Sequence, residues 1–280
     1  MRKSLTELIK QALLEDDFDN DITTLNLIGK EEIISGSFIV KTTGVVSGID
    51  IVKEVYRLVS PKIKLNILKE NGTYVNRGDV IASIEGPMRD VLRAEKVALN
   101  FLQRMSGIAG TTAKYVAELA GLECKILDTR QTTPLLREFE KLAVTHGGAF
   151  NSVFSLSEKV ILTDNHITSA GGIKPAVDEI KKILGRSTKI EVEVSNKEEF
   201  MEAYSTTVES IILKNIPLDI MKEIVEINDH KKKLIASGHE DLRKIRSVAL
   251  TGVDYIALES ITNSYKSLDI IFKTYKKRGN

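Results

Sequence analysis

The sequence predicts an α/β protein with two parts, an N-terminal α+β block and a β/α barrel of about six strands. From residue 125 onward, short apolar segments alternate with helical patterns, which is typical of parallel strands joined by right-handed crossovers. Before that point helices and strands are mixed and do not repeat. An open doubly wound sheet is the alternative, but no Gly-x-Gly-x-x-Gly motif follows a strand, so a dinucleotide-binding fold gains no support.

The N-terminal block begins with a helix over residues 4–16, in which Ser4 is the expected N-cap and Glu7 completes a capping box. A break is expected at Ser106-Gly107-Ile108-Ala109-Gly110, because its two glycines interrupt a helical pattern. The other elements expected in this block are a strand over 33–46, a helix over 51–59, a hairpin over 63–84, and helices over 88–105 and 111–120. A last helix, over 268–275, is expected to return toward this block.

The second part contains the regular alternation. Its expected strands are Lys125–Leu127, Val160–Leu162, Ile190–Val194, Ser210–Leu213, Lys233–Ala236 and Tyr255–Leu258. Its expected helices cover residues 135–144, 173–184, 197–204, 217–227 and 242–250. Because each strand is followed by a helix, a closed or nearly closed β/α barrel fits the pattern better than an open sheet.

The composition excludes several classes of partner. Lysine and arginine total 40 against 39 aspartate and glutamate residues, a formal charge of +1, so no electrostatic attachment to nucleic acid or to a membrane is expected. No stretch approaches eighteen consecutive apolar residues. Cys124 is the only cysteine and precedes an apolar strand, so we expect it to pack in the core. These features predict a soluble cytoplasmic protein.

The rest of the chain is organised around the segment 127–134, where one apolar strand ends in a polar run. In a parallel barrel the residues that follow each strand converge on one mouth. Glu191 and Glu193 alternate within a strand, so both face the same side, and a carboxylate in an apolar strand needs a partner. The polar residues collected at the predicted strand ends are Asp128, Thr129, Arg130, Thr163, Asp164, Asn165, His166, Lys214, Asn215, Ser237, Gly238, His239, Glu240, Glu259 and Ser260. This set predicts a small-molecule active site. No ligand spacing supports a resident metal.

Motifs along nearly the whole chain resemble those of the quinolinate phosphoribosyltransferase family, also called nicotinate-nucleotide pyrophosphorylase (carboxylating). In chain order they are 15–24, Glu85-Gly86-Pro87, 99–109, 127–134, 140–144, Gly147-Gly148, 163–167, 189–194 and 251–256. The resemblance implies a type II phosphoribosyltransferase fold. Its α/β sandwich covers residues 1–110 and is completed by 264–280, and an incomplete barrel over 111–263 carries the mouth.

The resemblance also implies an activity and an assembly. The family joins quinolinate, an acidic heterocycle, to phosphoribosyl pyrophosphate and releases carbon dioxide, which yields nicotinate mononucleotide for NAD biosynthesis. Mg2+ would accompany phosphoribosyl pyrophosphate. A homodimer or higher homo-oligomer is implied, in which Arg104 reaches into the partner's mouth. The positions that match the family's site residues are Arg104, Arg130, Arg137, His166 and Glu193. With the residues that stand at the other site positions, we expect three catalytic residues, Glu193, Lys214 and Arg130. The expected substrate-binding residues are Arg104, Arg130, Gln131, Thr132, Arg137, Thr163, His166, Glu193, Asn215, Ser237, Gly238, His239 and Glu259.

The sequence departs from the family pattern inside the expected mouth. A lysine is replaced by Gln131 and another by Thr163, and the family's Asn-His-Arg reads 151–153, Asn-Ser-Val. An aspartate is replaced by Lys214, which we expect to pair with Glu193, Glu240 or Glu259. In the phosphate-binding turns, glycines are replaced by His239 and Glu259. Each lost charged hydrogen bond costs about 1.5–3 kcal/mol. The alternatives are therefore a paralogue acting on another small acid or heterocycle without phosphoribosyl pyrophosphate, or a non-enzymatic dimeric binding protein.

Overall fold

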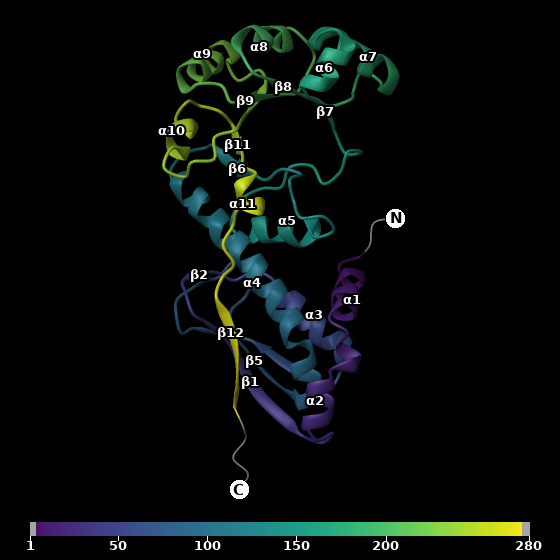
Figure 1. The fold of residues 1–280 in the computed structure, drawn as a ribbon. Helices are drawn as coiled ribbons and strands as arrows, with labels where there is room; N and C mark the ends of the chain where they lie inside the picture. The colour runs from purple at the N-terminus through teal and green to yellow at the C-terminus, as the bar shows by residue number, and fades with distance from the viewer. Residues whose placement is uncertain (1–3, 276–280) are drawn as a thin grey trace. The chain divides into compact units, whose positions relative to one another are not determined.

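The computed structural model describes residues 4–275, which divide into two compact units (Figure 1). The first unit holds the N-terminal residues through Ala113, residues 132–148 and the chain from Ser264. The second unit holds Lys114–Gln131 and Ala149–Asn263. Residues 132–148, expected as part of the barrel domain, thus belong to the first unit. None of the helices over residues 4–275 has both the length and the apolar character that a membrane crossing requires.

The first unit is built on a four-stranded antiparallel sheet in the order β12-β1-β5-β3. A separate pair joins β2 to β4. The strands are β1 (Ile33–Val40), β2 (Gly44–Val45), β3 (Lys64–Ile67), β4 (Tyr74–Val75), β5 (Val80–Pro87) and β12 (Ile270–Tyr275). The helices are α1 (Leu5–Glu15), η1 (Phe18–Asn20), α2 (Ile22–Leu27), α3 (Ile49–Val59), α4 (Met88–Glu118) and α5 (Arg137–His146). Residues 114–118 of α4 belong to the second unit.

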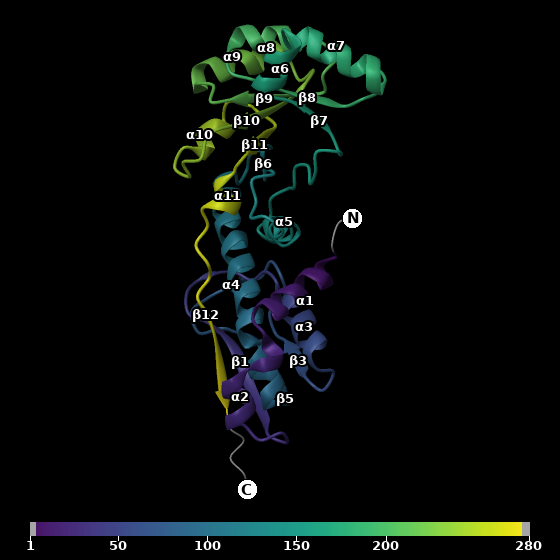
Figure 2. The ribbon, with the colours of Figure 1, turned by 45° about the vertical axis from the view of Figure 1, so that its right-hand side comes forward.

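Aromatic and aliphatic side chains form the core between this sheet and its helices. Phe38 on β1 is fully buried. The centre of its ring lies 6.3 Å from that of Tyr56 on α3, in an edge-on arrangement, and 5.1 Å from that of Phe272 on β12. The expected N-cap of α1 is confirmed, because the Ser4 hydroxyl accepts the Glu7 N–H at 3.2 Å. Figure 2 shows α1 and α3 side by side in this unit.

The predicted break after residue 105 is wrong, since α4 continues without interruption through Ser106-Gly107-Ile108-Ala109-Gly110. These small residues serve close packing. The Ser106 hydroxyl accepts the Ser47 N–H at 2.9 Å and donates to the Ser47 carbonyl at 3.1 Å. A Cβ on Gly107 would lie 2.6 Å from the Lys266 carbonyl oxygen. The glycine lets another segment of the chain approach the helix.

The predicted C-terminal helix over 268–275 is also wrong. Residues 270–275 form β12, which pairs antiparallel with β1 so that Phe38 lies opposite Phe272. Gly36 on β1 leaves room for the Phe272 ring, which a Cβ at that position would meet at 2.4 Å. Pairing with a strand more than two hundred residues away overrides the local helical pattern.

The second unit is a six-stranded parallel sheet in the order β6-β11-β10-β9-β8-β7. The expected strands are confirmed, with small changes at their ends. They are β6 (Lys125–Leu127), β7 (Val160–Leu162), β8 (Ile190–Val194), β9 (Ser210–Lys214), β10 (Lys233–Ser237) and β11 (Tyr255–Ala257). The helices are α6 (Asp164–Ala170), α7 (Ile173–Leu184), α8 (Lys197–Tyr204), α9 (Leu218–Asn228), α10 (Ile245–Ala249) and α11 (Ser260–Asn263). Figures 1 and 2 show α6–α9 on the outer face of β7–β9.

Candidate functional site

In the second unit, the polar residues that follow β6 are the first of the predicted site residues along the chain. Asp128 is fully buried and holds the neighbouring segment, since its Oδ1 accepts the Ser152 N–H at 2.6 Å and its own N–H donates to the Phe150 carbonyl at 3.0 Å. Arg130 follows and is exposed. The carbonyl of Gln131 accepts the Thr262 hydroxyl at 2.7 Å. Asp128 therefore fixes the strand end from which Arg130 projects.

Lys214 and Glu193 meet at the carboxyl ends of β9 and β8. The Lys214 Nζ lies 3.2 Å from Glu193 Oε2 and 3.5 Å from Asp164 Oδ2. Of the three expected partners, Glu193 is the one that pairs. This bond raises the pKa of Lys214, and Asp164 adds to the effect. The lysine side chain is 40% exposed, so solvent weakens the pair.

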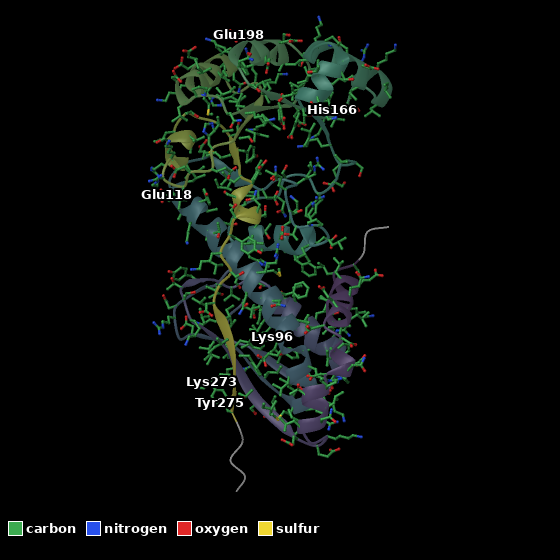
Figure 3. The ribbon with its side chains drawn as sticks, viewed as in Figure 1. Lys96, Glu118, His166, Glu198, Lys273 and Tyr275 are labelled. Carbon is green, nitrogen blue, oxygen red and sulfur yellow. The ribbon has the colours of Figure 1, made fainter. Side chains whose placement is uncertain are left out.

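His166 and Thr163 cap the start of α6. The Thr163 N–H donates to His166 Nδ1 at 3.1 Å, and the Thr163 hydroxyl lies 2.9 Å from the same nitrogen. Because Nδ1 accepts a hydrogen bond from the Thr163 N–H, the neutral ring carries its own hydrogen on Nε2. The ring is exposed on α6, where Figure 3 labels it. His166 can therefore donate a hydrogen bond to a ligand while it holds the helix end.

The turn after β10 places Gly238 against Asn215. Both residues have a positive φ, +86° for Gly238 and +56° for Asn215, and a Cβ on Gly238 would lie 1.9 Å from the Asn215 Oδ1. Only glycine fits this contact. Burial lowers the pKa of His239, against a smaller opposing effect of its hydrogen bond to the Ile216 backbone. Its Nε2 is buried and lacks a hydrogen-bond partner among the described residues.

Glu240 occupies the backbone N–H groups that follow β11. Its carboxylate accepts the Glu259 N–H at 3.1 Å, the Ser260 N–H at 3.2 Å and the Ser260 hydroxyl. The Tyr115 hydroxyl donates to the Glu240 carbonyl at 2.7 Å and fixes its backbone. Burial raises the pKa of Glu259, and the nearby Glu240 charge raises it further. The donors available to an anion at this strand end are thus already engaged by a carboxylate of the chain itself.

The first unit contains the remaining predicted site residues. Arg104 on α4 donates to the carboxylate of Glu140 and to the hydroxyl of Thr133, and its guanidinium lies 5.2 Å from the centre of the Tyr265 ring. Glu140 is fully buried and also accepts the Thr133 N–H at 3.0 Å. These contacts fix the guanidinium in one orientation.

A second arginine of this unit is held in the same segment. The Arg137 Nε donates to the Thr132 hydroxyl at 2.9 Å. Three of the predicted binding residues therefore lie at the segment 132–137, before and at the start of α5. Thr132 and Arg137 belong to it, and Arg104 contacts Thr133. Glu140 was not predicted as a site residue, because a glutamate on an amphipathic helix is ordinarily exposed.

The residues at the strand ends do not form a resident metal centre. Over residues 4–275, no group of three or more histidine, cysteine, aspartate or glutamate side chains could hold a metal ion. The carboxylates of Glu193 and Asp164 both contact the Lys214 Nζ, at 3.2 and 3.5 Å. One or two carboxylates suit a Mg2+ ion whose other ligands come from the phosphates of a substrate.

A six-stranded parallel sheet with polar side chains at the carboxyl ends of its strands is typical of β/α-barrel enzymes. Residues 21–106 match the family model of the quinolinate phosphoribosyl transferase N-terminal domain, and residues 108–273 match that of the C-terminal domain. The chain belongs to the quinolinate phosphoribosyltransferase family.

Curated relatives and solved structures agree with this assignment. The probable nicotinate-nucleotide pyrophosphorylase (carboxylating) of Bacillus subtilis is 35% identical over 266 residues, which cover 95% of this chain and 92% of that protein. The crystal structure of the Ehrlichia chaffeensis nicotinate-nucleotide pyrophosphorylase is 36% identical with a TM-score of 0.93, covering 98% of this chain and 100% of that one. The Francisella tularensis structure of the same name is 32% identical with a TM-score of 0.92, covering 98% of each chain.

Proposed function

We propose that this protein transfers the phosphoribosyl group of phosphoribosyl pyrophosphate to quinolinate with loss of carbon dioxide, and so makes nicotinate mononucleotide for NAD biosynthesis. Relatives named for this reaction align over nearly the whole chain. The observation that carries the proposal is the match to both family domains, over residues 21–106 and 108–273, with Glu193 at a position that matches a family motif. The products are nicotinate mononucleotide, pyrophosphate and carbon dioxide.

The protein's part in this reaction is positioning and charge stabilisation. Arg130, with Arg104 and Arg137, would bind the two carboxylates of quinolinate, because a guanidinium donates two parallel hydrogen bonds to a carboxylate. Glu193 would face the ribose carbon, where positive charge develops as pyrophosphate departs. Lys214 holds the Glu193 carboxylate in place and would offset the charge of the leaving group.

Mg2+ would enter with phosphoribosyl pyrophosphate, a role that the donor set allows but does not require. Glu193 and Asp164 are the carboxylates that would hold it, and Lys214, which contacts both, would compete with the metal for them. When bound, the ion would neutralise the pyrophosphate oxygens. The cytoplasmic location stays a prediction.

The homodimer is likewise part of the proposal. Arg104 would act in the mouth of the partner subunit, oriented by Glu140 and Tyr265. Glu140 would then serve as the positioning residue for a guanidinium that two subunits share. A C2 dimer gives both mouths the same complement of residues, since each subunit donates what it receives.

The engagement of the β11 amides by Glu240 favours a second function. The family resemblance implies that glycine-rich turns hold the 5′-phosphate of the donor, whereas here a carboxylate takes the backbone N–H groups of Glu259 and Ser260. In addition, the family's His-Arg is replaced by Ser152 and Val153. A paralogue that binds a small acid without a phosphorylated donor fits these two facts.

Replacing Arg130 by alanine tests the acid-binding role that both functions share. We expect quinolinate, titrated by calorimetry into the purified protein, to bind at least about tenfold more weakly to Arg130→Ala, because a charged hydrogen bond contributes about 1.5–3 kcal/mol. Lys197→Ala is the matched control, since Lys197 pairs with Glu223 on the surface at 2.5 Å. Equal quinolinate affinity in the wild type and Arg130→Ala would show that Arg130 does not bind this substrate.

A further inference from the structure

Leu135, just before α5, combines an unfavourable backbone conformation with an exposed side chain. Its φ is +67°, in the left-handed region that bulky residues rarely adopt. Over residues 4–275, four other non-glycine residues have a positive φ, and all of them are aspartate, asparagine or histidine, which tolerate it better. The Leu135 side chain is 71% exposed, so packing in the core does not compensate the backbone strain.

A tight turn imposes this conformation. The Leu136 N–H donates to the Thr133 carbonyl at 3.0 Å, which places Pro134 and Leu135 at the centre of a four-residue turn. A proline followed by a residue of positive φ is the pattern of a type II turn, which favours glycine at the position of Leu135. A glycine would adopt this conformation without steric cost, whereas leucine adopts it at the expense of stability.

Contacts on both sides of Leu135 hold the turn in place. The Thr133 N–H donates to the Glu140 carboxylate at 3.0 Å, and Arg104 donates to the Thr133 hydroxyl. The Glu140 N–H donates to the Leu136 carbonyl at 3.0 Å. Glu140, which is fully buried, therefore fixes both ends of the turn. Backbone strain that the surrounding contacts maintain in this way is concentrated at sites that bind ligands.

The predicted acid-binding residues of the first unit surround Leu135 in the chain. Thr132 and Arg137 lie on either side of the turn and are joined at 2.9 Å, and Arg104 contacts Thr133 within it. Small-molecule sites are lined mostly by apolar side chains, with a few polar groups that orient the ligand. The predicted site residues are all polar, charged or glycine. An exposed leucine in this segment supplies the apolar surface that they lack.

We propose that Leu135 is a specificity-determining residue, which packs on the ring face of an aromatic acid whose carboxylates Arg104 and Arg137 bind. This role rests on the proposed function, because it takes the ligand to be an acid of the proposed kind. It adds the residue that distinguishes a ring from an open-chain acid. Arg104 is proposed to act in the mouth of the partner subunit, so Leu135 would contact the substrate bound there.

Calorimetric titration of quinolinate and of maleate tests this role. Both ligands carry two carboxylates on adjacent carbons, but only quinolinate has a ring. Leu135→Gly should bind quinolinate about tenfold more weakly, because an apolar contact is lost, and should bind maleate as the wild type does. Leu135→Asn should behave like Leu135→Gly. Leu135→Met keeps an apolar side chain and should keep the quinolinate affinity.

Urea unfolding distinguishes the loss of this contact from damage to the fold. Leu135→Gly and Leu135→Asn should unfold at higher urea concentrations than the wild type, since both residues adopt a positive φ more readily than leucine. Weaker quinolinate binding in a more stable protein is not what a purely structural leucine would give. Leu27→Asn is the matched control, because Leu27 is 79% exposed on α2, and it should leave the quinolinate affinity unchanged.

Four results would overturn the proposal. They are unchanged quinolinate affinity in Leu135→Gly, an equal loss of affinity for quinolinate and maleate, dissociation of Leu135→Gly into smaller species in sedimentation, or a wild type that binds neither quinolinate nor phthalate. Phthalate is a second aromatic acid with adjacent carboxylates, and it replaces quinolinate in these titrations if quinolinate does not bind. A protein that binds either ring through Leu135 but makes no nicotinate mononucleotide would contradict the transferase activity alone.

Discussion

Individual side chains decide how the strand ends can be used, and Glu240 is the clearest case. Glycine-rich phosphate turns work because backbone N–H groups stay open to an anion. In this chain the carboxylate of Glu240 fills them. A substrate phosphate must displace Glu240 or bind elsewhere. Glu240 therefore limits which phosphorylated substrates can bind at this strand end.

Glu240→Ala should open these amides. If the donor's 5′-phosphate binds there, the KM for phosphoribosyl pyrophosphate should fall about tenfold, since two charge-assisted hydrogen bonds become available. The measurement is steady-state kinetics at saturating quinolinate. Glu240→Gln is the control, because it keeps an acceptor oxygen on the same N–H groups and should change the KM less. A higher KM in Glu240→Ala would instead assign Glu240 to donor binding.

The pair of Lys214 and Glu193 shows what residue-level reasoning can predict. A lysine at a strand end beside a carboxylate on the next strand was expected to form an ion pair, and the structure joins them at 3.2 Å. The 40% exposure of the Lys214 side chain could not be predicted, because it depends on how the neighbouring segments pack around the strand end. Glu140 was missed for the same reason, since its partner Arg104 lies on another helix.

At the level of elements, apolar strands and amphipathic helices of the second unit were predicted well. β7, β8, α7 and α8 have the expected limits, because a short apolar segment between helices has few alternatives in a parallel sheet. The failures, in α4 and β12, both involve distant partners. Gly107 inside α4 serves packing against residues 266 and 267, and β12 is a strand because β1 pairs with it.

Two glycines of α4 allow a direct test of this interpretation. Gly107→Ala should destabilise the fold by about 1–3 kcal/mol, because the new Cβ would overlap the Lys266 carbonyl and the Ser267 Cα. Gly110→Ala is the matched control. Its Cβ would meet nothing closer than 3.6 Å, so the gain in helix propensity should stabilise the protein by up to about 1 kcal/mol.

Urea unfolding of the two variants and the wild type measures both effects. A stabilising Gly107→Ala would contradict the packing role of that glycine. The comparison is informative because both substitutions change the unfolded chain in the same way. Their difference therefore reports the contact with residues 266 and 267.

At the scale of the whole molecule, the proposal divides one active site between two subunits. Arg104→Ala and Glu193→Gln should each be inactive alone. Mixed and allowed to exchange subunits, they should regain about a quarter of the wild-type activity, because half of the dimers would be mixed and one of their two mouths would carry both native residues. Activity that stays absent after proven subunit exchange would place Arg104 and Glu193 in the same subunit's mouth.

The central claim is that the mouth, with its altered cations and its engaged amides, still carries out the family reaction. The most direct test is a turnover assay of the purified protein with quinolinate, phosphoribosyl pyrophosphate and Mg2+, followed by mass spectrometry. The account predicts nicotinate mononucleotide and pyrophosphate in equal amounts, with their formation lost in Arg130→Ala. A folded protein that binds quinolinate but makes no nicotinate mononucleotide would contradict the claim and favour the paralogue that acts on another small acid.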